Sequence, residues 1–246
     1  MTKKVFIDAG HGGKDSGAAS NGLKEKDIVL KVANEVAKRL QANYEGVEVI
    51  LSRSTDVFLE LKERTDKANK ANADVLVSIH CNAGGGAGGF ESFTYNGTSS
   101  AATAAFQNVL HTEIMNRLAK FNVTDRGQKK ANLHMCRESK MPAVLTENLF
   151  VDVAADANKL KRNEVLEAII SGHVAGIAKY LGLKAKSSAQ TDSTGVVSIL
   201  VNGVNIGNGK IENGVTLAPV RAIAQALGAN VLYDPTNKIV KVITSK

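Results

Sequence analysis

The sequence contains few of the residues that build disulfide frameworks and cysteine-rich metal sites. Only two of its 246 residues are cysteines, Cys81 and Cys136, and they form no CxxC motif. A disulfide scaffold is therefore excluded. Cys81 directly follows His80 and could be taken for a metal ligand or a nucleophile, but we favour a small buried side chain at this position.

Long hydrophobic runs are also missing. No stretch is apolar for long enough to span a bilayer, so no membrane span is expected. The N-terminus, Met1–Lys4, leads into only a few apolar residues before Asp8, without the apolar core or cleavage site of a secretory signal. We expect a protein that is made in the cytoplasm and that reaches any target outside by a route other than a signal peptide.

Aromatic residues are scarce, and the charge is unbalanced toward basic residues. Aromatic side chains make up only 4% of the chain, and the formal net charge is +7, which favours polyanionic partners. The segment after Ser188 holds five basic and three acidic residues, so +2 of this charge lies there and +5 lies before it. Because no nucleic-acid-binding motif is recognisable, we expect no nucleic-acid partner. An anionic cell wall fits the charge equally well.

What the chain does contain is an alternation of strand-like and helix-like segments before residue 182. Apolar runs predict strands, and apolar residues at helical spacing predict helices. The alternation predicts an α/β fold, with a mostly parallel sheet flanked by helices on both faces. Arg64 and Lys67 are expected on the polar side of their helix, and residues 122–139 are expected to be mostly loop. The expected strands are 3–8, 47–51, 74–80, 90–95 and 142–147, and the expected helices are 26–41, 59–72, 99–120 and 155–181.

A change of composition predicts a second, smaller domain. Residues 184–195 hold almost no large apolar side chain and are interpreted as a linker between a first domain, 1–183, and a C-terminal module, 196–246. In the module, Asn202-Gly203 between two apolar runs is a hairpin signal. A short helix from Pro219 and two strands around a turn at 234–237 complete a small α+β module, near the lower size limit for independent stability.

Ionisable side chains follow the predicted parallel strands. The first strand runs into His11, which is surrounded by glycines that let the backbone turn beside the imidazole. The third predicted strand ends at His80 and the last one at Glu147. Because open α/β sheets bind ligands at the carboxyl ends of their strands, these three side chains should converge there. Glu25 begins the helix that returns from the His11 loop, so it can reach the same edge.

Two histidines and one carboxylate, with a fourth position left open, match a catalytic zinc site. A second carboxylate outside the coordination sphere is what a zinc hydrolase needs to move a proton from water to the leaving nitrogen. Structural interpretations remain open: Glu25 suits a helix N-terminus, His80 could be a hydrogen-bonded core residue, and Glu147 could pair with a buried arginine. His111 and His173 lie within predicted helices and are expected to be structural or solvent-facing.

Four short segments carry a family resemblance: residues 8–13 (DAGHGG), 24–27 (KEKD), 78–83 (SIHCNA) and 142–147 (PAVLTE). In order and approximate spacing they resemble the zinc-dependent N-acetylmuramoyl-L-alanine amidases of the amidase 3 family, over about residues 3–182. The resemblance implies that His11, Glu25 and His80 are the zinc ligands and that Glu147 is the catalytic carboxylate. The implied reaction is hydrolysis of the amide bond between the lactyl group of N-acetylmuramic acid and L-alanine in peptidoglycan.

The chain departs from this family at one point. Residues 148–150 are Asn-Leu-Phe, where the resemblance leads us to expect a glycine near Leu149. The loop after His80 is a short glycine run, without the long helix that blocks the site in some members, so an open site is expected. Arg126 could hold a carboxylate of the peptide substrate by a bidentate contact, or it could form a loop salt bridge with Asp125.

The C-terminal module more weakly resembles the small domain related to the copper amine oxidase N-terminal domain. The matching stretches are Val201–Gly203, Leu217–Arg221 and Leu227–Ala229. The module contains no histidine, so copper binding is not implied. We expect it to attach the protein to the cell wall, with anionic wall polymers as its ligands, and a dimerisation or spacer role stays open.

The sequence thus predicts a zinc amidase that cuts peptidoglycan, of the phage-endolysin or sporulation-autolysin type. Such a protein would act at the wall after phage lysis or mother-cell lysis has released it. Two alternatives remain: a zinc peptidase that acts on the peptidoglycan stem peptide, and a non-catalytic protein that binds the cell wall.

Overall fold

The computed structural model describes residues 2–186, 196–202, 204–212, 215–234 and 239–244. The chain divides into two compact units, Met1–Lys186 and Ser187–Lys246. The expected linker, 184–195, lies outside the described residues from position 187 onward. Along the described part of the chain, no helix has the length and apolar character needed to cross a membrane.

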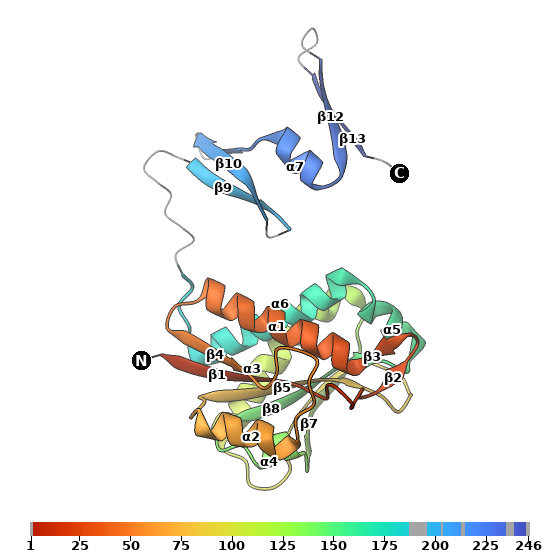
Figure 1. Cartoon of the computed structure of the whole chain (residues 1–246), viewed down its shortest axis with the longest axis vertical. Helices are drawn as coiled ribbons and strands as arrows, with labels where there is room; N and C mark the ends of the chain where they lie inside the picture. The colour runs from red at the N-terminus through yellow and green to blue at the C-terminus, as the bar shows by residue number, and fades with distance from the viewer. Residues whose placement is uncertain (1, 187–195, 203, 213–214, 235–238, 245–246) are drawn as a thin grey trace. The chain divides into compact units, whose positions relative to one another are not determined.

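A six-stranded sheet forms the centre of the first unit (Figure 1). Its strands, in spatial order, are β4 (Val47–Leu51), β1 (Lys3–Ala9), β5 (Val75–Asn82), β8 (Ala143–Phe150), β6 (Phe90–Tyr95) and β7 (Asp125–Ala131). The first four run parallel, β6 is antiparallel to β8, and β7 is parallel to β6. The mostly parallel sheet predicted from the sequence is therefore confirmed. A minimal hairpin, β2 (Ala19–Ser20) and β3 (Leu23–Lys24), follows β1.

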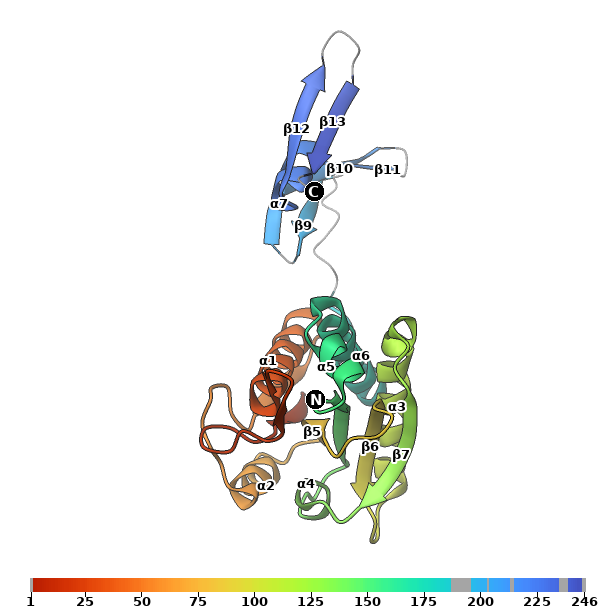
Figure 2. The same ribbon diagram turned by 90° about the vertical axis from the view of Figure 1, so that its right-hand side faces the viewer.

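Helices cover both faces of this sheet (Figure 2). One face carries α1 (Glu25–Asn43), α3 (Ala101–Leu118) with the short turn η1 (Ala119–Phe121), α5 (Ala154–Leu160) and α6 (Asn163–Leu181). The opposite face carries α2 (Leu61–Lys70) and α4 (His134–Arg137). Alternate residues of β1 supply the two cores: Val5 and Ile7 pack into the larger one, and Phe6 into the smaller one beside Ala68 and Met135.

Two predictions about this unit were wrong. The segment 122–139 is not mostly loop, because it contains β7 and α4. β7 is a polar strand at the edge of the sheet, so hydrophobic periodicity could not reveal it. The single helix predicted over 155–181 is two helices, separated at Arg162, whose backbone is extended (φ −89°, ψ 125°). Leu160 and Val165 lie five positions apart, so in one continuous helix they would point to different sides of it. The break at Arg162 lets both side chains be buried.

In its described residues, the second unit is a small antiparallel structure with one helix. Its first sheet has the strand order β11-β10-β9, and a separate two-stranded ribbon is formed by β12 and β13. The predicted hairpin turn at 202–203 and the turn at 234–237 fall in part outside the described residues. The elements are β9 (Val196–Val201), β10 (Val204–Glu212), β11 (Val215–Leu217), α7 (Val220–Ala226), β12 (Ala229–Asp234) and β13 (Ile239–Thr244).

Candidate metal centre

Residues from three separate parts of the chain meet at the carboxyl ends of β1 and β5. His11 follows β1, His80 lies near the end of β5, and Glu25 is the first residue of α1. Each offers one ligand atom, and these three atoms lie within 4.8 Å of one another. Two imidazole nitrogens and one carboxylate oxygen form a donor set that suits a catalytic zinc ion. The three predicted ligands are therefore close enough to share one metal ion.

The carboxylate of Glu25 lies between the two imidazole rings. Its Oε1 is 3.1 Å from Nε2 of His11 and 3.0 Å from Nδ1 of His80, and it also accepts a hydrogen bond from the backbone N–H of Cys81. Its Oε2 accepts a hydrogen bond from the backbone N–H of Ala18. Glu25 therefore has a role beyond favouring the start of a helix, because its side chain is buried and turned into the site.

The electrostatics of the three groups favour positive charge at this point. Burial alone would raise the pKa of Glu25, but hydrogen bonds and charge from the two histidines lower it well below its usual value. Burial opposes a charged His11, yet the hydrogen bond to Glu25 raises the pKa of His11 to about 9. The pKa of His80 is also raised, against the effect of burial, by Glu25 and Glu147. The buried negative charge of Glu25 thus stabilises positive charge at this point, which is carried either by protonated rings or by a metal cation bound to the neutral imidazoles.

The orientation of His11 is fixed by a neighbour that the sequence analysis did not identify. Nδ1 of His11 lies 2.8 Å from a carboxylate oxygen of Asp15, which leaves Nε2 facing Glu25. Carboxylates often orient the outer nitrogen of a metal-binding histidine in this way. The signal in the sequence was a carboxylate four residues after the histidine.

Glycines give the two rings their space. A Cβ on Gly10 would lie 2.3 Å from the ring of His80, and a Cβ on Gly17 would lie 2.6 Å from both His11 and Glu25. Such distances are far inside van der Waals contact, so any larger residue would displace the candidate ligands. At Gly10, whose φ is not in the left-handed region, the requirement for glycine is therefore steric.

His11 itself has a left-handed backbone conformation (φ 58°), which is uncommon outside glycine. Two arginines bind the carbonyl groups of this turn. Arg53 donates hydrogen bonds to the carbonyls of Ala9 and Gly10, at 3.0 and 2.7 Å. Arg64 donates to the carbonyls of Ala9 and His11, both at 2.7 Å. These contacts hold the strained turn in place and so position the first candidate ligand.

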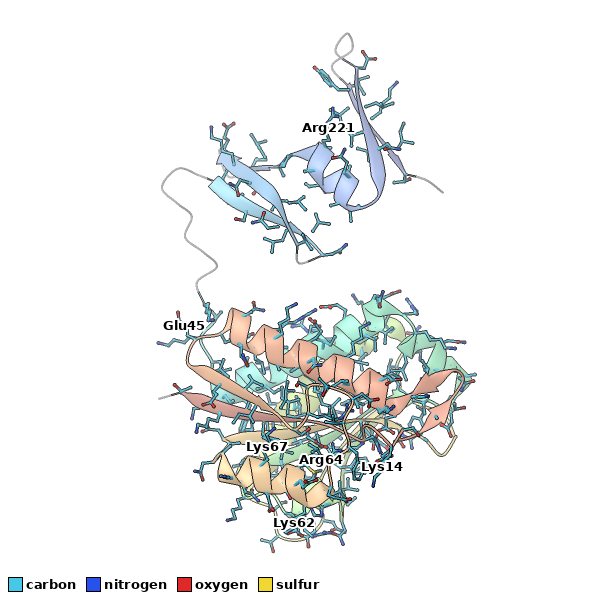
Figure 3. The ribbon with its side chains drawn as sticks, viewed as in Figure 1. Lys14, Glu45, Lys62, Arg64, Lys67 and Arg221 are labelled. Carbon is cyan, nitrogen blue, oxygen red and sulfur yellow. The ribbon has the colours of Figure 1, made fainter. Side chains whose placement is uncertain are left out.

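The expected position of Arg64 on the polar side of its helix was wrong. Its side chain is only 2% exposed and pairs with the buried Asp8, Nη1 to Oδ1 at 3.0 Å. Figure 3 shows Arg64 on the side of α2 toward the sheet, whereas Lys62 points away from it. Arg64 lowers the pKa of Asp8, although burial alone would raise it. The guanidinium fits here because its donors reach both a carboxylate and the backbone carbonyls of the His11 turn.

Glu147 lies on β8 directly beside His80, because the two residues are paired in the parallel register of β5 and β8. Among the described residues, its buried Oε2 has no hydrogen-bond partner. Burial is the main cause that raises the pKa of Glu147 to about 7, with the charges of Glu25 and Glu91 adding to it and the two histidines opposing it. Such a carboxyl group can accept and release a proton near neutral pH.

The departure noted after Glu147 coincides with a distorted backbone. Leu149 is buried and has a left-handed conformation (φ 66°), which glycine adopts without strain and leucine rarely does. The strand pairing shifts here, because Asn82 of β5 pairs with Phe150 and one extra residue of β8 forms a bulge. The side-chain amide of Asn148 donates to the carbonyl of His80 at 2.9 Å, which ties the bulge to the candidate ligand.

Arg126 lies on β7 and takes part in a charged cluster beside Glu147. Its Nε donates to Glu91 at 2.9 Å, and its guanidinium stacks over the ring of Phe150 at 4.8 Å. Lys129 also forms a salt bridge with Glu91. In the antiparallel register of β6 and β8, Glu91 lies opposite Glu147. The alternative of a salt bridge from Arg126 to its neighbour Asp125 is not observed, because Arg126 pairs with Glu91 instead.

The remaining candidates are structural. His111 lies between the hydroxyl of Ser92 and the carboxylate of Asp125, and it is buried rather than solvent-facing. His173 is buried between the backbone carbonyl of Ile169 and the hydroxyl of Thr146, and burial lowers the pKa of His173 to about 4. Cys81 is buried and free, as expected, and burial raises its pKa.

Comparisons with known proteins match both units. The family profile of N-acetylmuramoyl-L-alanine amidase matches residues 5–179, and that of the copper amine oxidase N-terminal domain matches residues 200–246. The endolysin of Bacillus phage SPP1 is 52% identical over 188 residues, which cover 76% of this chain and 69% of the relative. The sporulation-specific N-acetylmuramoyl-L-alanine amidase of Bacillus subtilis (strain 168) is 45% identical over 186 residues, which cover 76% of this chain and 71% of the relative.

Solved structures agree with these matches. The catalytic domain of CwlV, an N-acetylmuramoyl-L-alanine amidase from Bacillus (Paenibacillus) polymyxa, has a TM-score of 0.69 at 38% identity and covers 74% of this chain and 100% of that domain. An N-acetylmuramoyl-L-alanine amidase from Clostridium difficile 630 has a TM-score of 0.69 at 34% identity, with 74% of this chain and 97% of the other covered.

We expect Arg64→Met to lower the free energy of unfolding by about 3–5 kcal/mol, because it leaves Asp8 buried without its charge partner. Denaturant unfolding followed by circular dichroism measures this change. Lys62→Met is the control: Lys62 is 78% exposed and forms a salt bridge with exposed Asp66, so a change within about 0.5 kcal/mol is expected. An equal effect of the two substitutions would contradict the role assigned to Arg64.

Proposed function

The chain belongs to the N-acetylmuramoyl-L-alanine amidase family, and we propose that His11, Glu25 and His80 hold the zinc ion with which it cleaves peptidoglycan, with Glu147 as its catalytic carboxylate. It is an enzyme that hydrolyses the amide bond between N-acetylmuramic acid and L-alanine. The family is metal-dependent, and these three side chains form a possible metal site. The choice of zinc rests on the donor set of two imidazoles and one carboxylate.

The convergence of the four side chains is the observation that carries this proposal. Three candidate ligand atoms lie within 4.8 Å of one another, and Glu147 is paired in register with His80 on the adjacent strand. When bound, zinc supplies a Lewis acid that polarises the scissile carbonyl and lets water attack at neutral pH. The geometry supports a site in which a bound metal would lie beside Glu147, the proposed proton-transfer group.

Glu147 carries the proton through the reaction. As a carboxylate it accepts the proton of the attacking water, and as a carboxylic acid it returns that proton to the nitrogen of the departing L-alanine. A pKa of about 7 makes both forms accessible at neutral pH. Oε2 is suited to this role because it has no hydrogen-bond partner among the described residues.

We propose that Arg126 binds a carboxylate of the stem peptide. Glu91 and the ring of Phe150 fix its guanidinium, and the side chain of Arg126 is 29% exposed. Through the pairing of β6 with β8, this cluster lies beside Glu147. A guanidinium held in this way can form a bidentate contact with a peptide carboxylate.

We also propose that the second unit attaches the enzyme to anionic wall polymers. It matches the copper amine oxidase N-terminal domain, and its segment after Ser188 carries a net charge of +2.

The names of the relatives, an endolysin and a sporulation-specific amidase, support action at the cell wall after release by phage lysis or mother-cell lysis.

The metal and the carboxylate can be tested together. Chelation is expected to abolish digestion of purified cell walls, and added zinc is expected to restore it. Glu147→Gln should retain one zinc per chain and lose about 10²-fold or more in activity, because only the proton-transfer group is removed. His80→Ala should lose both zinc and activity. Metal content and wall turbidity measure these outcomes.

Product analysis separates the amidase from its alternatives. New free amino groups on L-alanine are expected, whereas released D-alanine would indicate a peptidase acting on the stem peptide. Full activity of Glu147→Gln would refute the assignment of Glu147, and digestion that survives complete removal of metal would refute the zinc site.

The role of Arg126 predicts an effect on substrate binding. Arg126→Met should raise KM for soluble peptidoglycan fragments about tenfold or more, with little change in kcat, because a charge-assisted contact made with bound substrate is lost. Lys130→Met on the same strand removes one exposed positive charge as a control. Equal KM values for the two variants would show that Arg126 makes no specific contact.

Wall attachment predicts a dependence on salt and on charge. Retention of the full chain on purified walls should fall as the salt concentration rises, because screening weakens contacts between exposed charges. The double variant Arg221→Gln and Lys241→Gln should be retained less than the wild type at low salt. Retention that is the same in both proteins would count against a charge-based attachment.

A further inference from the structure

The exposed large apolar side chains of the first unit lie beside the candidate metal centre. In the described part of that unit there are two of them, Val57 at 46% and Leu61 at 51% exposure. Val57 lies in the loop after β4, and Leu61 is the first residue of α2. Because β4 and β1 are parallel neighbours, this loop and the start of α2 lie at the same edge of the sheet as His11. We call Val57, Phe58 and Leu61 the ledge.

The loop of the ledge packs directly against the glycine turn that carries the first candidate ligand. A Cβ on Gly12 would lie 2.2 Å from the carbonyl oxygen of Val57. A Cβ on Gly13 would lie 2.7 Å from the backbone nitrogen of Phe58. The next residue, Lys14, places its Nζ 4.3 Å from the centre of the Phe58 ring. No side chain fits between the turn and the loop, so the ledge continues the surface that begins at the candidate metal centre.

The loop is fixed by hydrogen bonds although two of the ledge side chains are exposed. The carboxylate of Asp56 accepts hydrogen bonds from the backbone N–H of Gly13 and from the ammonium group of Lys26, both at 2.7 Å. Arg64, which also binds the carbonyl groups of the turn, donates to the carbonyl of Leu59 at 3.1 Å. A surface that is ordered before binding loses less conformational entropy when a ligand covers it. The ledge is therefore suited to binding.

The strand order places the ledge at one end of the site and Arg126 at the other. The sheet has the order β4-β1-β5-β8-β6-β7, and β6 and β7 begin at the edge where the first four strands end. Along this edge the chain presents the ledge, the three candidate metal ligands, Glu147 and then Arg126. Figure 2 shows the same arrangement, with α2 on one side of β5 and with β6 and β7 on the other.

The proposed reaction has a direction along this edge. The scissile carbonyl belongs to the lactyl group of N-acetylmuramic acid and must face the metal site. The scissile nitrogen belongs to L-alanine and must face Glu147, which returns the proton to it. The sugar side of the amide bond therefore points from the metal site toward the ledge, and the peptide side points from Glu147 toward Arg126.

The distribution of charge agrees with this direction. Arg126 and Lys129 both pair with a single carboxylate, that of Glu91, so positive charge is in excess at the end assigned to the peptide. A stem peptide carries carboxylates, which favour this end. The three ledge side chains are uncharged, as is the glycan.

We propose that the ledge binds the glycan strand of peptidoglycan, with the sugars over Val57 and Leu61 and the stem peptide toward Arg126. This assignment rests on the proposed roles of the metal site and of Glu147. The C–H faces of the sugar rings and the methyl groups of their N-acetyl substituents can pack on apolar side chains. Lys14 is exposed and has no ion pair in the part of the chain that the structure describes, so its ammonium group can donate to sugar oxygens.

Kinetics with soluble glycan–peptide fragments test the ledge. The double variant Val57→Ser and Leu61→Ser should raise KM about tenfold, with little change in kcat and one zinc per chain, because only contacts with bound glycan are lost. The double variant Val242→Ser and Leu232→Ser makes the same two changes at 50% and 57% exposure in the second unit and should keep the wild-type KM. A wild-type KM in the ledge variant would overturn the proposal.

Inhibition by the two reaction products tests the direction. Peptide-free glycan fragments should inhibit the ledge variant about tenfold less strongly than the wild type, and free stem peptide should inhibit both equally. Arg126→Met should show the opposite pattern. A ledge variant that instead loses inhibition by the stem peptide would show that the peptide lies on the ledge, and this result would overturn the proposal.

These outcomes are distinct from a failure of the proposed function. Digestion that survives removal of metal, or full activity of Glu147→Gln, would refute the metal site or the catalytic carboxylate, and the direction of the substrate would fall with them. A protein that needs zinc and Glu147, but whose ledge variant keeps the wild-type KM and product inhibition, would overturn the ledge assignment alone.

Discussion

The candidate metal centre depends on two buried arginines that fix a strained turn. His11 follows a buried strand in a left-handed conformation, and its neighbouring carbonyls would be left without partners at the end of the sheet. Arg53 and Arg64 bind those carbonyls, and Arg64 is held in turn by Asp8. Asp15 then orients the imidazole toward Glu25. Each of these contacts restricts the position of the next residue. The first candidate ligand, His11, is therefore placed by hydrogen bonds from residues that are not themselves candidate ligands.

Two glutamates of the same site are adapted to opposite tasks. Glu25 lies between two histidines, which lower its pKa against the effect of burial and keep it a carboxylate fit to bind a cation, and it also accepts two backbone hydrogen bonds. Glu147 is buried, lacks such donors at Oε2, and has a raised pKa, which suits proton transfer. Surroundings, rather than residue type, thus separate the proposed ligand from the proposed acid–base group. The two glutamates also come from different elements, because Glu25 begins α1 and Glu147 lies on β8.

The sequence predicted the elements that carry strong hydrophobic patterns and missed those that do not. His11, His80 and Glu147 were predicted to converge because buried parallel strands end beside them, and their strands do lie adjacent. The polar edge strand β7 and the break at Arg162 had no such pattern. Arg64 was assigned to the helix surface because charged residues usually lie there. Its burial depends on Asp8 and on carbonyls 53 or more positions away, which periodicity within one helix cannot reveal.

The direct test of the central claim is X-ray absorption at the zinc edge of the purified, active protein. The account predicts one zinc per chain with two imidazole nitrogens and one carboxylate oxygen at about 2.0–2.2 Å, together with a further light atom in the open position. Replacement of His80 by alanine should abolish the zinc signal, and replacement of His11 or Glu25 should abolish it or remove one of these ligands. A sulfur ligand at about 2.3 Å, which would implicate Cys81, or a coordination shell unchanged by those replacements would contradict the account.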